Sequence, residues 1–211
     1  TLNVVASFFS NETVNAFNAE KYEDAIKYAE QAIESAKAAN YKEALEQSKY
    51  VMALSYEILK NTTKANELYR ELIKENTKKP DVYIKIFAAN QAEKQTDKAI
   101  NVLKRGVKNL PDNAQLKALL GSTYLQAGQK EEAEKIVQSL LALGEKKEVF
   151  NYVGDIYRDA SDIAKAEEYY NKSLALDAAQ TDAYFGLAST YFNKAVDVLK
   201  VPFSRSKMRY I

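Results

Sequence analysis

Residues 116–124 read LKALLGSTY, and residues 133–137 read AEKIV. One repeat length earlier, residues 82–90 read VYIKIFAAN and residues 99–103 read AINVL, with apolar and small residues in corresponding places. Apolar residues recur three and four positions apart in these stretches, which is typical of amphipathic helices. Residues 80–147 therefore predict two helical hairpins built on one repeated pattern, with a period of about 34 residues.

The same period extends beyond this pair. The alanines that open the second helix of each predicted hairpin recur once per period, as Ala65, Ala99, Ala133 and Ala166. A small residue followed three positions later by tyrosine recurs in the first helices, as Ala53 with Tyr56, Gly121 with Tyr124, Gly154 with Tyr157, and Ala188 with Tyr191. A period of about 34 residues with this pattern is the signature of a helical repeat protein.

Over roughly residues 10–200 the chain resembles the tetratricopeptide repeat family. The resemblance implies an all-α fold, a right-handed α-solenoid of helix-turn-helix hairpins with about five repeats and a terminal helix. In such repeats the small residue lets two helices approach closely, and the aromatic residue fills the space beside it. We therefore expect six tyrosines in the core, namely Tyr56, Tyr69, Tyr124, Tyr157, Tyr170 and Tyr191.

The repeat pattern also predicts where the elements begin and end. One solenoid domain is expected over residues 1–211, with hairpins at 10–40, 41–79, 80–113, 114–147 and 148–179, a terminal helix at 180–201 and a tail at 202–211. Two irregularities interrupt the pattern. Phe87 and Asn90 replace the small residue and the tyrosine in the 80–113 hairpin, and the interval from Ala25 to Ala65 is six positions longer than the period. The extra residues are expected to lengthen the helices on either side of Asn40.

Composition supports a helical protein and limits its function. The 211 residues include only 6 Gly and 3 Pro, which is little turn chemistry for a β fold. A net charge of +1 gives no electrostatic basis for binding nucleic acid. No apolar run is long enough to span a membrane. The chain has no His and no Cys, so we expect no catalytic site, no metal site and no cofactor.

One group of charged residues has two interpretations. Asp155, Asp159 and Asp162 follow one another at helical spacing, with Arg158 among them. They would suit a basic peptide segment or a hard cation, but a solvated polar helix face is the favoured interpretation because charged helix surfaces are common.

The family resemblance implies that first helices line a concave groove in which an extended peptide or a helix docks. The candidate groove residues are first-helix positions off the packing stripe: Tyr50, Leu54, Ile84, Gln91, Ser122, Leu125, Asn151, Asp155, Arg158, Phe185, Ser189 and Phe192. Some family members hold a partner's C-terminal carboxylate with a clamp of Lys and Asn. Tyr50, Val51, Leu54, Asp81 and Lys85 occupy the matching positions, so only one basic residue remains, which argues against such a receptor.

The leading functional hypothesis is a non-enzymatic protein-interaction scaffold that binds a peptide or helical segment of a partner in this groove. The alternative is a structural or assembly module that self-associates, as a homodimer through its C-terminal helix. Its motivation is the unfinished last repeat, whose apolar residues are Val196, Leu199, Val201 and Phe203.

The two ends of the chain give little information about function or location. Residues 1–9 suit the first turn of a helix or the end of a signal peptide, with the helix favoured, and they are the only indication of a bacterial cell-envelope protein. Residues 194–211 carry five basic residues against Asp197, suited to an anionic membrane surface or an acidic partner, although a frayed terminus is the favoured interpretation. Neither end decides between cytoplasm and periplasm.

Overall fold

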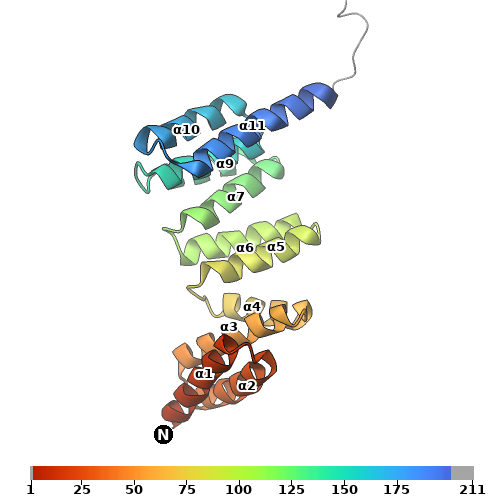
Figure 1. Cartoon of the computed structure of the whole chain (residues 1–211), viewed down its shortest axis with the longest axis vertical. Coiled ribbons are helices and arrows are strands. Elements are labelled where there is room, and N and C mark those ends of the chain that lie inside the picture. The colour runs from red at the N-terminus through yellow and green to blue at the C-terminus, as the bar shows by residue number, and fades with distance from the viewer. Residues whose placement is uncertain (1, 201–211) are drawn as a thin grey trace, which may run out of the picture. The chain divides into compact units, whose positions relative to one another are not determined.

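The structure, a computed structural model, describes the backbone of residues 2–200 and the side chains of residues 2–196. Within this range it contains eleven α-helices and no strand (Figure 1). The helices are α1 (Leu2–Asn18), α2 (Tyr22–Ala39), α3 (Lys42–Ile58), α4 (Thr62–Lys74), α5 (Pro80–Ala92), α6 (Thr96–Asn109), α7 (Ala114–Gln126), α8 (Lys130–Leu141), α9 (Lys147–Asp159), α10 (Ile163–Leu176) and α11 (Thr181–Lys200). The predicted all-α fold is confirmed.

The chain divides into two compact units. Unit 1 comprises Thr1–Pro111 and contains α1 to α6, and unit 2 comprises Asp112–Ile211 and contains α7 to α11. Each unit is built from consecutive hairpins, in which a first helix with an odd number packs on a second helix with an even number, and α11 follows the last hairpin of unit 2. The continuity of all 211 residues as one solenoid domain stays a prediction.

The hairpin turns share one backbone conformation. The residues at the turns of the five hairpins, Glu20, Lys60, Lys94, Gly128 and Ser161, all have positive φ, between 56° and 74°. A left-handed residue at this position lets the chain leave the first helix with its last carbonyl groups satisfied. Among these five residues only Gly128 adopts this conformation without a steric cost.

Unit 1 begins with longer helices than the rest of the chain. The sequence predicted a first hairpin over residues 10–40, but α1 already starts at Leu2. Residues 2–9 therefore form the beginning of this helix, which is the interpretation that the sequence favoured for them. Around Asn40, α2 and α3 have 18 and 17 residues, against 13 in α4 and in α5. The residues beyond the normal period therefore lengthen the two helices beside Asn40, as expected.

The core of unit 2 is organised around the ring of Tyr170 in α10, which is fully buried. A Cβ atom added to Gly154 of α9 would lie 2.7 Å from this ring, and one added to Gly186 of α11 would overlap it. The ring therefore lies between two glycines on different helices. The sequence predicted this close approach at Gly154 correctly, but in α11 it predicted Ala188, which is exposed; Gly186 makes the contact instead.

Four of the six tyrosines predicted in the core are buried, namely Tyr69, Tyr124, Tyr157 and Tyr170. The prediction was wrong for the other two. Tyr56 is half-buried with Lys64 over its ring, and Tyr191 is 46% exposed. Tyr191 lies in the last described helix, so no further helix covers it within residues 2–200.

Candidate protein-interaction face

The candidate groove residues fall into two sets, four in unit 1 and eight in unit 2. In unit 2 they occupy equal repeat positions, because α7, α9 and α11 begin one repeat length apart, at Ala114, Lys147 and Thr181. Since α9 packs against both α7 and α11, equal positions lie on a common side of the three helices. We call this set the interaction face: Ser122, Leu125, Asn151, Asp155, Arg158, Phe185, Ser189 and Phe192.

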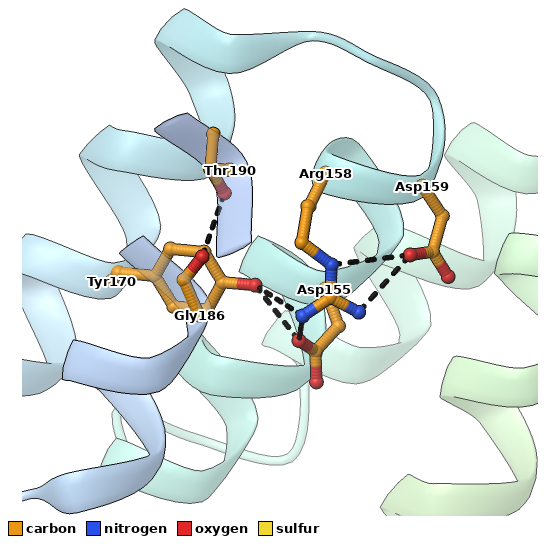
Figure 2. A network of polar contacts seen from close by, with 6 residues as sticks. All are labelled: Asp155, Arg158, Asp159, Tyr170, Gly186 and Thr190. Carbon is orange, nitrogen blue, oxygen red and sulfur yellow. Dashed lines mark hydrogen bonds and ion pairs between the residues drawn. The ribbon is translucent and has the colours of Figure 1, made fainter. Parts of the chain in front are cut away.

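The middle of the interaction face is a polar network centred on Asp155 and Arg158 (Figure 2). Arg158 Nη1 donates to Asp155 Oδ1 over 2.6 Å, and Arg158 Nη2 donates to Asp159 Oδ1 over 3.0 Å. The Tyr170 hydroxyl donates to Asp155 Oδ1 over 2.8 Å and accepts from Arg158 Nη1 over 3.2 Å. A tyrosine from α10 thus fixes an ion pair of α9.

Burial governs the electrostatics of this network. It raises the pKa of Asp155, and the hydrogen bond from Tyr170 and the charge of Arg158 only partly oppose this rise. Burial lowers the pKa of Arg158, but the nearby Asp155 and Asp159 outweigh it, so this pKa is raised. Burial and the Asp155 carboxylate raise the pKa of Tyr170 far above its usual value, which keeps the phenol protonated as a donor at neutral pH.

The α11 part of the interaction face is apolar and prominent. Phe185 and Phe192 are 73% and 68% exposed, and they lie seven positions apart with the half-buried Ser189 between them. Seven positions are close to two helical turns, so both rings project from one side of α11. Exposed phenylalanines at this spacing favour an interaction surface, because a solvated helix face normally carries polar side chains there.

The remaining members of the interaction face are less accessible. Asn151 is only 7% exposed, and its buried Oδ1 has no hydrogen-bond partner. Ser122 and Leu125 of α7 are half-buried, and Leu125 borders a cleft of about 220 Å³ together with Ile156 and Tyr157. These residues can line a contact, but they cannot anchor it.

In unit 1 the candidates Tyr50, Leu54, Ile84 and Gln91 are all half-buried. The Tyr50 hydroxyl donates to Asp81 Oδ2 over 2.6 Å, and its ring lies under Lys79 Nζ, 4.7 Å from the ring centre. The sequence placed Tyr50 among the candidate groove residues. Its contacts instead link α3 to α5, so its side chain is already committed within the unit.

A second polar link joins the same two helices. Lys85 Nζ of α5 donates to both carboxylate oxygens of Glu57 in α3, over 2.9 and 2.7 Å, and the Tyr69 hydroxyl of α4 donates to Glu57 Oε2 over 2.8 Å. Burial raises the pKa of Glu57, but the hydrogen bonds from Lys85 and Tyr69 outweigh it, so the pKa lies below its usual value.

The three acids of α9 and its following turn have separate roles. Asp155 and Asp159 bind Arg158, and Asp162 caps α10 by accepting from the Lys165 amide over 3.2 Å. Among the described residues no group of three or more His, Cys, Asp or Glu is placed to hold a metal ion. No helix in the described part of the chain is long and apolar enough to cross a membrane.

Sequence reasoning missed several features of this region. The Tyr170 hydroxyl reaches Asp155 from another helix, and Tyr50 of α3 reaches Asp81 of α5, so no local spacing indicates either bond. The close approach at Gly186 had one signal, because a glycine within a helix is unfavourable unless a neighbour needs the space.

Models of the tetratricopeptide repeat match residues 59–121, 90–151 and 149–180, which together cover more than half of the chain. A human protein, Protein IFIT1 homolog B, is 31% identical over 87 residues. That match covers 41% of this chain but only 18% of the human protein, so the chain spans less than a fifth of that relative's length.

Solved structures of repeat proteins are similar in fold. A tetratricopeptide repeat protein from Parabacteroides merdae superposes with a TM-score of 0.68 at 12% identity, over 92% of this chain and 75% of that chain. YrrB, described as a TPR protein with an unusual peptide-binding site, superposes with a TM-score of 0.57 at 15% identity, over 84% and 89% of the two chains. These matches confirm the predicted fold class, a solenoid of tetratricopeptide hairpins.

Proposed function

Because the chain belongs to the tetratricopeptide repeat family, whose fold serves in general as a non-enzymatic protein-interaction scaffold, we propose that unit 2 binds a peptide or helical segment of a partner protein across its interaction face. The partner's apolar side chains pack on Phe185 and Phe192. Its polar groups meet the Asp155–Arg158 network.

The observation that carries this proposal is the exposure of Phe185 and Phe192, 73% and 68% in a folded helix. Covering a phenylalanine ring contributes about 2 kcal/mol. Two such rings on one side of α11 therefore supply much of the affinity that a peptide contact needs. Ser189 lies between them, and its small side chain leaves the space between the rings open.

The neighbouring network gives the partner segment a chemical preference. Asp155 and Asp159 provide two carboxylates against the single guanidinium of Arg158, so the cluster has an excess of negative charge. A basic side chain beside the apolar anchors of the partner would therefore be favoured over an acidic one. Because Tyr170 holds Asp155 and Arg158 in place, the polar contact needs little reorganisation on binding.

Asn151 adds a second polar contact. Its Oδ1 is buried without a donor, which costs free energy in the unbound protein. Rotation of this amide toward the interaction face would let it accept from a backbone N–H of the bound segment. The unpaired oxygen supports a partner that presents its backbone, as an extended peptide does.

The proposal is tested by selecting peptides from a random displayed library against the full chain and measuring their affinity for variants by fluorescence anisotropy. Replacing either Phe185 or Phe192 with alanine should weaken binding at least about tenfold. The matched control is Phe8→Ala, which removes a 57% exposed phenylalanine of unit 1 and should leave affinity unchanged. Selected peptides that bind the correctly folded Phe185→Ala and Phe192→Ala variants as tightly as the unaltered chain would contradict the proposal.

A further inference from the structure

Helix α11 repeats a packing surface that α9 buries. A shift of one repeat length places Phe150, Gly154 and Tyr157 of α9 on Tyr184, Ala188 and Tyr191 of α11. The register is supported by a repeated hydrogen bond. Tyr157 donates to Glu134 of the preceding second helix, and Tyr191 donates to Glu167, the corresponding residue of the next second helix.

In α9 this surface is covered by the second helix of its own hairpin. The rings of Phe150 and Tyr157 lie 6.3 and 5.8 Å from the ring of Tyr169, and Gly154 faces Tyr170. As a result Phe150 and Tyr157 are only 9% and 8% exposed.

The corresponding surface of α11 is uncovered in the described part of the chain. Tyr184 and Tyr191 are 54% and 46% exposed, and Ala188 is exposed as well. Phe185 and Phe192 border them on the side of the interaction face. We call these five residues the open face of α11.

The open face is uncharged, mostly aromatic and symmetric in sequence. Residues 183–193 read AYFGLASTYFN and contain no charged residue. Counted from Ala188, aromatic residues stand three and four positions away in both directions, and Thr181 and Ala195 stand seven positions away. In a two-fold contact residue i of one copy meets residue j of the other, and j meets i. With this pattern, two antiparallel copies of the helix bring aromatic residues against aromatic residues on both sides of Ala188.

We propose that the open face of α11 pairs with the open face of a second copy of this chain, with the two helices antiparallel and crossing at Ala188. In this register Tyr184 faces Tyr191 of the second copy, and Phe185 faces Phe192 of the second copy. The small Ala188 lets the two helices approach closely at the crossing point. Aromatic pairs on both sides then close the contact.

The size of the open face matches a weak, reversible dimer. An aromatic side chain buries about 150–250 Å² when fully covered. With the four rings between 46% and 73% exposed, pairing covers about 500 Å² per copy, or about 1,000 Å² in total. This is near the lower limit for a specific interface, so the dimer should form in the micromolar range.

Of the residues that the sequence suggested for self-association, Val201 and Phe203 lie outside the described residues, and only the backbone of Leu199 belongs to them. Val196 is half-buried and lies on α11 beyond the aromatic residues. The contact proposed here therefore lies closer to the start of α11. This dimer contact goes beyond the proposed function and does not depend on it. Phe185 and Phe192 belong to both the open face and the interaction face, so a dimer would exclude a peptide from these two residues.

Sedimentation velocity of the full chain, from low to high micromolar concentration, tests the dimer. The unaltered chain should shift from monomer to dimer as concentration rises, and Ala188→Arg should remain monomeric throughout. Because Ala188 is exposed, its replacement removes no packing within the folded chain, and circular dichroism should be unchanged. Asn193→Arg is the matched control, since it adds the same charge at an exposed α11 position outside the open face and should still dimerise.

Two results would overturn the inference: a chain that stays monomeric at every concentration, or a dimer that Ala188→Arg leaves intact. Sedimentation without peptide separates this inference from peptide binding. Ala188 lies three and four positions from Phe185 and Phe192, so Ala188→Arg also places a charge beside the peptide anchors and is used to test self-association alone. Loss of peptide binding in the Phe185→Ala variant would say nothing about the dimer, which sedimentation velocity tests separately.

Discussion

The packing of Tyr170 makes Gly186→Ala the most informative single substitution. The added methyl group would overlap Cε1 and Cζ of the Tyr170 ring and lie 2.8 Å from its hydroxyl oxygen. The ring is constrained on its other side as well. Gly154 closes its other side, and its hydroxyl is held by Asp155 and Arg158.

One favourable and two unfavourable effects set the magnitude. Alanine is more favourable than glycine inside a helix by about 1 kcal/mol. Forcing a methyl group into a packed core costs about 1–3 kcal/mol. Displacing the Tyr170 hydroxyl also weakens its hydrogen bonds to Asp155 and Arg158, worth about 1 kcal/mol. We therefore expect Gly186→Ala to lower the free energy of unfolding by about 1–3 kcal/mol.

The assay is urea unfolding followed by far-ultraviolet circular dichroism, since the chain has no Trp. A double-mutant cycle isolates the contact with Tyr170. In a Tyr170→Leu background the ring atoms that clash are gone, so Gly186→Ala should become stabilising by about 1 kcal/mol through helix propensity alone. A Gly186→Ala substitution that stabilises the otherwise unaltered chain would refute the placement of Tyr170 between the two glycines.

Two further predictions concern the hairpin turns and the Glu57 carboxylate. Lys94→Gly should raise the free energy of unfolding by about 1 kcal/mol, because Lys94 has a φ of 56° in its hairpin turn. Gly128→Lys should lower the free energy of unfolding by about the same amount, because Gly128 has a φ of 74° in the corresponding turn. If denaturant titration gave the two changes the same sign, the shared turn geometry would be contradicted. For Glu57, the hydrogen bonds from Lys85 and Tyr69 lower the pKa, so its ionised form adds stability above the unfolded-state pKa and loses it as the pH falls through the folded-state pKa. Glu57→Gln should therefore be more destabilising at neutral pH than at about pH 3, and an equal effect at both values would show that the carboxylate charge is unimportant.

Much of the fold can be predicted from local sequence, because the residues that pack the two helices of a hairpin recur in several repeats. Gly121 and Gly154 are each followed three positions later by a tyrosine, and both lie where a neighbouring helix comes close. Ala188 shows where this reasoning stops. Its position in the repeat was assigned correctly, yet burial there needs a second helix, and a periodic pattern does not say whether the next element is present.

The candidate site was predictable only in part, for a related reason. The pairing of Asp155 with Arg158 follows from their spacing of three positions on one helix. The hydrogen bonds of Tyr170 to this ion pair depend on how α10 packs on α9, and no local sequence pattern indicates that packing. For Tyr50 the prediction of a free groove residue was wrong, because its hydroxyl is already bound to Asp81.

The central claim, that unit 2 recognises a partner segment through its interaction face, is tested most directly by backbone amide NMR of the labelled chain during titration with a selected peptide. The account predicts that chemical shift changes concentrate on the first helices α7, α9 and α11, with Asp155, Ser189 and Phe192 among the largest. Changes confined to the second helices α8 and α10, with those three residues unmoved, would contradict it.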